Sequence, residues 1–281
     1  MTSFLLVFSF ILGTIIGSFL NVVTFRYNTG MTLGGRSKCF SCNKTLSWIE
    51  LFPILSFIMQ SGSCRKCKSK ISWQYPMVEI GAGILFLLVF LFFPPVSVVS
   101  SFMAVFYLFI TCLLVVITTY DIKHKIIPDP LVYTFAIVAL ARLFISDDLS
   151  FVFPSLIDLL SGPILALPFF LLWLLSKGSW MGLGDAKLAL GIGWLLGPVY
   201  GMAAVFFAFI IGATVSVPLL FFSSVLWGRI LDKFTPIFSS RKTPLRLTIK
   251  SEVPFGPFLI ASCLLAWFAL MYSVPLLFLW Q

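Results

Sequence analysis

Long apolar runs separated by short polar connections dominate this sequence. Stretches long enough to cross about 30 Å of hydrocarbon run over residues 4–25, 76–94, 99–120, 130–146, 155–175 and 255–279. The stretch 186–227 is too long for one crossing, and Gly197 and Pro198 predict a turn that divides it into a shorter and a longer helix. The pattern therefore predicts about eight transmembrane helices.

Composition supports a membrane protein. Of the 281 residues, 60% are hydrophobic and only 10% are charged, and the mean hydropathy is +1.08. The first apolar run lacks the basic start and the small-residue cleavage site of a secretory signal, so we expect a retained helix. The predicted fold class is an all-α polytopic membrane protein, in which the lipid bilayer is one partner of the chain.

The distribution of basic residues predicts the orientation. The loop 26–74 holds eight Lys and Arg and the loop 228–252 holds six, and about eight crossings place both loops on one side. We assign that side to the cytoplasm, and the loop with Asp147 and Asp148 to the opposite side. The net charge of +9 is thus explained by topology, and we expect no nucleic-acid partner.

The loop 26–74 contains two Cys-x-x-Cys pairs with twenty-one residues between them, Cys39 and Cys42, then Cys64 and Cys67. Two such pairs predict a tetrahedral, zinc-ribbon-like site in which zinc is structural, because four thiolates leave no open coordination position. The alternative is a pair of disulfides, which a reducing cytoplasmic setting disfavours. We expect three parts, namely a first helix over 1–25, a small cytoplasmic cysteine domain over 26–74, and a transmembrane core over 75–281.

Two carboxylates are predicted to meet at one face of the membrane. Asp121 ends the third apolar run, and Asp185 opens the sixth in "MGLGDAKLALG". Paired carboxyls that share a proton perform aspartyl protease chemistry, one as general base and one as general acid. Taken singly, Asp185 is also explained as a helix cap and Asp121 as an interfacial anchor beside Lys123. Gly182 and Gly184 lack side chains and would allow a substrate backbone to approach.

Six segments in order resemble the type IV prepilin peptidases, a family of bacterial membrane aspartyl proteases with a Gly-x-Gly-Asp motif. The segments are "GSFLNVVTFR" at 17–26, the two cysteine pairs, "YPMVEI" at 75–80, "YDIKHKIIPD" at 120–129, "MGLGDAKLALGIGWLLG" at 181–197 and "VPFGPFL" at 253–259. The resemblance spans nearly the whole chain. It implies that Asp121 and Asp185 are the catalytic pair.

By the same resemblance, the substrates are type IV prepilins or pseudopilins, cleaved at the cytoplasmic face of the bacterial inner membrane. Many family members also methylate the new N-terminus with S-adenosylmethionine, although no nucleotide-binding motif is visible in this sequence. Glu79, in "YPMVEI", is an accessory candidate that would orient the loop or the substrate amine; the alternative is an ion pair with a basic neighbour.

Two other function classes are compatible with carboxylates in membrane helices. An ion or metal transporter would use them to line a path, with the cysteines sensing metal. A non-catalytic scaffold would use the cysteine loop to dock a cytoplasmic partner. The sequence leaves the oligomeric state open.

Overall fold

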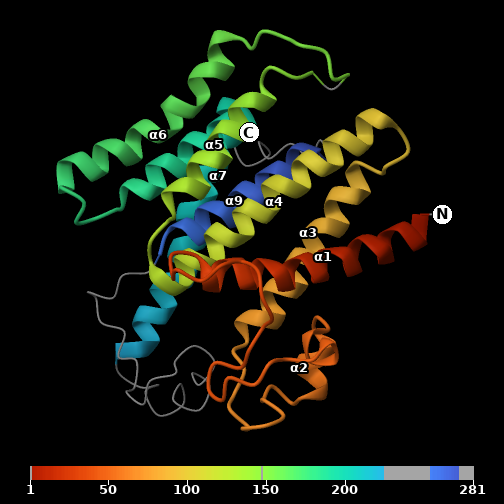
Figure 1. Cartoon of the computed structure of the whole chain (residues 1–281). Coiled ribbons are helices and arrows are strands. Elements are labelled where there is room, and N and C mark those ends of the chain that lie inside the picture. The colour runs from red at the N-terminus through yellow and green to blue at the C-terminus, as the bar shows by residue number, and fades with distance from the viewer. Residues whose placement is uncertain (1, 147, 225–253, 272–281) are drawn as a thin grey trace. The chain divides into compact units, whose positions relative to one another are not determined.

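The chain is all helical in the computed structural model, which describes residues 2–146, 148–224 and 254–271 (Figure 1). Within these residues there are isolated β-bridges but no strands. Five helices are long and apolar enough to cross a membrane, and a sixth apolar helix is shorter. The predicted all-α polytopic membrane fold is therefore confirmed.

The helix bounds follow the apolar runs closely. The helices are α1 (Thr2–Arg26), α2 (Leu55–Met59), α3 (Gln74–Phe92), α4 (Val98–His124), α5 (Asp129–Arg142), α6 (Leu156–Ser176), α7 (Leu183–Ser224) and α9 (Gly256–Met271), with a 3-10 turn η1 at Trp48–Leu51. Gly197 breaks α7, with a φ of 73°. The split of α7 thus lies at the predicted turn. The basic loop 228–252 and the end of the last apolar run lie outside the described residues.

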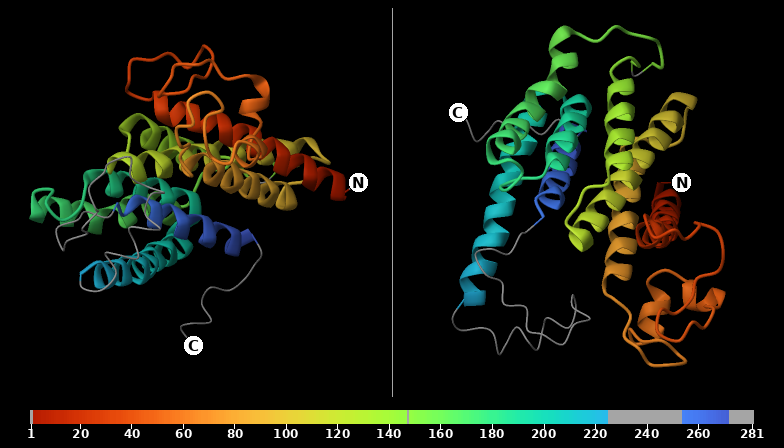
Figure 2. Two further views of the ribbon diagram at one scale, coloured as in Figure 1. Left: turned by 90° about the horizontal axis from the view of Figure 1, so that it is seen from below. Right: turned by 60° about the vertical axis from the view of Figure 1, so that its left-hand side comes forward.

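The chain forms two compact units. The first contains α1, α3 and the beginning of α4, together with the cysteine loop (Figure 2). Glycines allow α1 and α3 to pack closely. A Cβ on Gly13 would lie 2.7 Å from the carbonyl oxygen of Ala82, and one on Gly17 would lie 2.9 Å from Cα of Glu79. Small residues are what permit backbones to approach in this way in lipid.

The second unit contains the end of α4, then α5, α6, α7 and α9. α7 packs against α5, α6 and α9. α5 begins at Asp129, with Pro130 in its first turn, and its N-cap is Pro128. The Asp129 carboxylate accepts a 2.7 Å bond from Nζ of Lys187 on α7. The Asp129 side chain therefore links α5 to α7 and does not cap α5.

Candidate active site and metal centre

Asp121 lies in the last turn of α4 and is buried, with 3% of its surface exposed. The backbone amide of Gly256, at the beginning of α9, donates to this carboxyl group. Among the described residues, its Oδ2 atom has no hydrogen-bond partner. Burial of a carboxyl group with an unpaired oxygen lowers the stability of the fold. Such groups are found mainly where they have a function.

Asp185 is the third residue of α7 and is also buried, with 8% exposure. Its carboxyl group accepts from the backbone amide of Gly182. This is the arrangement of an acidic residue at N3 that reaches back to the N-cap. The helix-capping alternative is therefore partly right, because Asp185 caps α7 from inside the helix.

The two carboxyl groups are close enough to interact electrostatically, although Asp121 and Asp185 come from different helices. Each one accepts a single backbone amide, and the amide donor is a glycine in both cases. Two buried carboxyls that repel each other in this way are most stable when they share one proton. The structure thus brings together the two acids that the sequence paired.

The two glycines of "GLGD" have different surroundings. A Cβ at Gly184 would lie 2.8 Å from Cβ of Ile127. Apart from its chain neighbours, the described residues nearest to a Cβ at Gly182 are Asp185 and Gly184, both 3.9 Å away. Gly184 is therefore required by packing. Gly182 faces open space, as the expected access for a substrate backbone requires.

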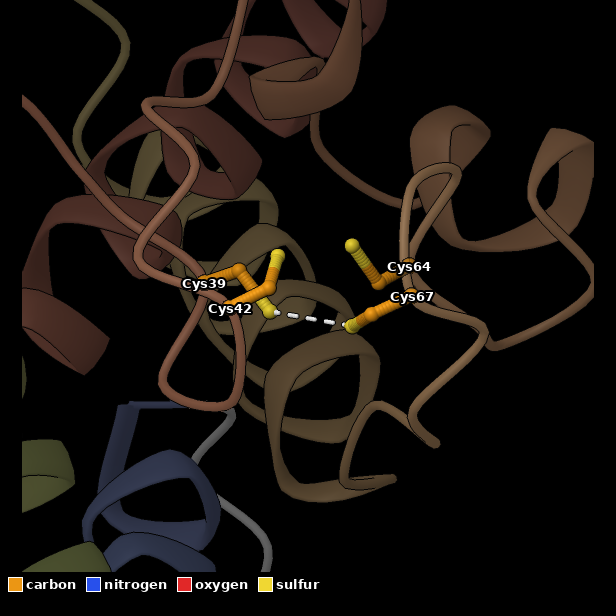
Figure 3. Close-up of side chains that lie close together, drawn as sticks. All are labelled: Cys39, Cys42, Cys64 and Cys67. Carbon is orange, nitrogen blue, oxygen red and sulfur yellow. Dashed lines mark hydrogen bonds between the residues drawn. The ribbon is translucent and has the colours of Figure 1, made fainter.

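The four cysteines of the loop converge from two separate turns (Figure 3). Their sulfur atoms lie within 4.8 Å of one another, and those of Cys39 and Cys67 are 3.8 Å apart. A tetrahedral zinc site with Zn–S bonds of about 2.3 Å has sulfurs about 3.8 Å apart, so the cluster fits such a metal. All six cysteines of the chain are free, and the disulfide alternative is wrong.

The two cysteine turns have the same backbone design. In each, the amide of the first cysteine bonds to a carbonyl five residues later, Lys44 for Cys39 and Ser69 for Cys64, at 2.9 Å in both cases. The amides of Cys42 and Ser41 hydrogen-bond to the Cys39 sulfur and lower its pKa to about 6. A side-chain hydrogen bond from Ser69 lowers the pKa of Cys67. Both shifts favour the thiolate, which is the form that binds a metal.

Glu79 connects the cysteine loop to the helices of its own unit. Its Oε2 accepts a 2.7 Å hydrogen bond from the backbone amide of Ile54, and its side chain also bonds to Ser18 on α1. The residue is 6% exposed. Ile54 has a φ of 61°, a conformation that a β-branched residue adopts only when its surroundings enforce it. Among the described residues no ion pair of Glu79 is present, so the geometry supports orientation of the loop over the ion-pair alternative.

Comparison with known proteins identifies the family of this chain. A model of the bacterial Peptidase A24 N-terminal domain matches residues 11–93, and a model of the type IV leader peptidase family matches residues 108–217. The prepilin leader peptidase/N-methyltransferase of Bacillus subtilis is 30% identical over 267 residues, which cover 92% of each chain. The chain belongs to the type IV leader peptidase family.

Two further relatives have the same name. The prepilin leader peptidase/N-methyltransferase of Vibrio cholerae is 32% identical over 206 residues, covering 69% of this chain and 78% of the relative. That of Dickeya chrysanthemi is 27% identical over 281 residues, covering 90% and 88%. No solved structure gives a significant match. The type IV leader peptidase match includes Asp121 and Asp185, and the N-terminal match includes the four cysteines and Glu79.

The sequence alone did not reveal the role of Gly256 or of Ile127. Both lie in segments quoted for the family resemblance, yet neither side chain has any chemistry of its own. The one available signal was a glycine between Phe255 and Pro257 at the start of an apolar run, a context that predicts a helix start. That signal does not say which residue the glycine meets.

Proposed function

We propose that this protein is a membrane-embedded aspartyl endopeptidase that removes the basic leader of type IV prepilins or pseudopilins. The observation that carries the proposal is the pair of buried, interacting carboxyls of Asp121 and Asp185, each with one glycine amide donor. The names of the related enzymes supply the substrate class. Under this proposal the protein lies in the bacterial inner membrane, with the site facing the cytoplasm.

In the reaction, the ionised member of the pair removes a proton from water as the oxygen attacks the scissile carbonyl. The protonated member gives its proton to the carbonyl oxygen, and a tetrahedral diol forms. The member that took the proton from water then gives it to the leaving nitrogen, while the other member accepts a proton from a diol hydroxyl as the C–N bond breaks and the new carbonyl forms. The pair again shares one proton. The unpartnered Oδ2 of Asp121 is the oxygen free to bind the water.

The open space at Gly182 supplies the route for the substrate backbone. A glycine here leaves room on one side of Asp185, so an extended peptide can reach the pair without moving a side chain. The family's substrates place a hydrophobic helix after the cleaved bond, and this helix would remain in lipid while the leader stays in water.

We further propose that the cysteine loop over 26–74 is a zinc-binding domain, beside a first helix over 1–25 and a peptidase core over 75–281. Cys39, Cys42, Cys64 and Cys67 would hold zinc, whose role with four thiolate ligands is to order the loop. By the names of its relatives, the enzyme also methylates the new N-terminus. S-adenosylmethionine would supply an electrophilic methyl group for that transfer.

Cleavage of a synthetic prepilin in detergent or in vesicles, followed by mass spectrometry, tests the peptidase proposal. Asp121→Asn and Asp185→Asn should each lower kcat by roughly 10³-fold or more while the protein still folds. Asp158→Asn is the matched control, because that carboxylate lies in the first turn of α6 and accepts a hydrogen bond from the hydroxyl of Ser155. Substantial activity in either active-site variant would overturn the assignment. A transporter or a scaffold predicts no cleavage by the wild type.

Methyl transfer has a separate test, with S-adenosylmethionine labelled on its methyl group and a peptide that is already cleaved. The proposal expects label on the peptide N-terminus in the wild type and also in Asp185→Asn, since methylation does not require proteolysis in this assay. Normal cleavage of prepilin without any label transfer would exclude the second activity.

A further inference from the structure

The first turn of α9 approaches the Asp121 carboxyl group through Gly256. The backbone amide of Gly256 donates to that carboxyl group. Pro257 has no N–H, and the amide of Phe258 bonds to the carbonyl of Phe255 at 3.0 Å. Gly256 is therefore the residue of this turn whose amide is directed at the acid.

Space at this contact exists only because residue 256 lacks a side chain. A Cβ on Gly256 would overlap the Oδ2 atom of Asp121 and lie 3.4 Å from its Cγ. It would also lie 3.2 Å from Cδ1 of Ile127. Asp121 is buried, with 3% of its surface exposed, so protein atoms and not solvent surround its carboxyl group. The carboxyl group therefore has no open space into which it could move.

We propose that Gly256 is a positioning residue for Asp121. Its amide orients the carboxyl group, and its missing side chain leaves Oδ2 free toward the reaction. Gly256 lies beyond residue 217, where the type IV leader peptidase match ends, and nothing in the sequence connects it with the acid. The inference rests on the proposed peptidase function, since positioning matters only if Asp121 takes part in the reaction.

The first test compares Gly256→Ala with Gly212→Ala in prepilin cleavage. Gly212 is the matched control because it lies at the contact between α7 and α9, and a Cβ there has 3.4 Å to its nearest neighbour, an ordinary contact. Gly256→Ala should lower kcat about tenfold or more, with KM within about threefold of the wild type, because a misplaced catalytic group slows chemistry and leaves binding intact. Its pH profile of kcat should change, whereas that of Gly212→Ala should match the wild type.

Ile127 provides an internal check on the cause. If the methyl group acts by pressing on Ile127, the double variant Gly256→Ala/Ile127→Val should recover activity relative to Gly256→Ala. The proposal expects no recovery, because Asp121 remains displaced. Recovery to the level of Ile127→Val alone would overturn it, as would wild-type kcat in Gly256→Ala.

A second measurement covers the case in which Gly256→Ala does not accumulate as folded protein. In an Asp121→Ala background the carboxyl group that the new methyl would meet is gone. Gly256→Ala should then be tolerated, with a melting temperature close to that of Asp121→Ala alone. Failure to fold in both backgrounds would place the clash elsewhere and overturn the proposal.

The outcomes also separate this inference from the peptidase proposal. Full activity in Asp121→Asn would refute the proposed function, whatever Gly256→Ala does. Loss of activity in Asp121→Asn together with wild-type activity in Gly256→Ala would refute only the positioning role.

Discussion

Gly184 on α7 packs directly on the side chain of Ile127, in the segment between α4 and α5. An added Cβ on Gly184 would lie 2.8 Å from Cβ of Ile127. Ile127 is buried, with 9% exposure, and also borders Gly256. Ile127 thus contacts Gly184, which precedes Asp185 in the chain, and also Gly256, whose amide donates to Asp121.

The two glycines before Asp185 should respond differently to alanine. We expect Gly184→Ala to lower kcat about tenfold or more and to destabilise the fold by roughly 1–3 kcal/mol, because the methyl must displace Ile127. Gly182→Ala should fold normally, because its Cβ would enter open space. Prepilin cleavage and thermal unfolding of both variants check this. Equal effects on folding would show that the contact with Ile127 is not decisive.

Removal of metal should loosen the cysteine loop without unfolding it fully, because the Lys44–Glu50 ion pair and the hydrogen bond from Ile54 to Glu79 remain. Elemental analysis of the purified wild type should find about one zinc per chain, and Cys39→Ser/Cys64→Ser should lose it and become sensitive to trypsin within residues 26–74. Cys112→Ser is the control, since Cys112 lies in α4 and outside the cluster. Unchanged trypsin resistance in the metal-free variant would show that zinc does not order the loop.

Substitutions of Glu79 should separate hydrogen bonding from charge. Gln at this position can still accept from the amide of Ile54, whereas Ala leaves that amide without its partner, at a cost of about 1–3 kcal/mol to the loop. Hydrogen exchange at Ile54 should therefore accelerate in Glu79→Ala and stay near the wild-type rate in Glu79→Gln. Fast exchange in both would mean that the negative charge, and not the acceptor, holds the loop.

The ion pair between Glu50 and Lys44 should make the metal-free loop sensitive to acid. The Lys44 ammonium lies 2.8 Å from Oε1 of Glu50. That hydrogen bond, together with the amide of Ser47, lowers the pKa of Glu50 from 4.5 to about 2. A lowered carboxyl pKa means that the stabilisation is complete above pH 4.5 and is lost as the pH falls toward 2.

Pepsin digestion of the metal-free loop over this pH range, scaled to an unfolded peptide, measures the effect. Protection of the wild type should decline as the pH falls, whereas Glu50→Gln should be less protected at the upper end and change little with pH. Lys70→Met, which removes an exposed charge outside the pair, should behave like the wild type. A steep pH dependence in Glu50→Gln would assign the titration to another group.

Much of the fold was readable from the chain alone, since in lipid each apolar run must satisfy its backbone groups within one helix. The helices α1, α3, α4 and α6 accordingly begin and end close to the predicted runs. The spacing of the cysteine pairs likewise predicted a cluster, because a tetrahedral thiolate site needs two short turns. The family motifs identified Asp121 and Asp185.

The surroundings of those acids depended on the tertiary structure. No local pattern relates Gly256 to Asp121 or Gly184 to Ile127, because each contact joins segments far apart in the sequence and depends on a glycine that lacks a side chain. The same holds for the amide of Ile54 at Glu79. The length of each apolar run determines which segments enter the membrane. The packing of the helices determines which backbone group contacts a buried carboxyl.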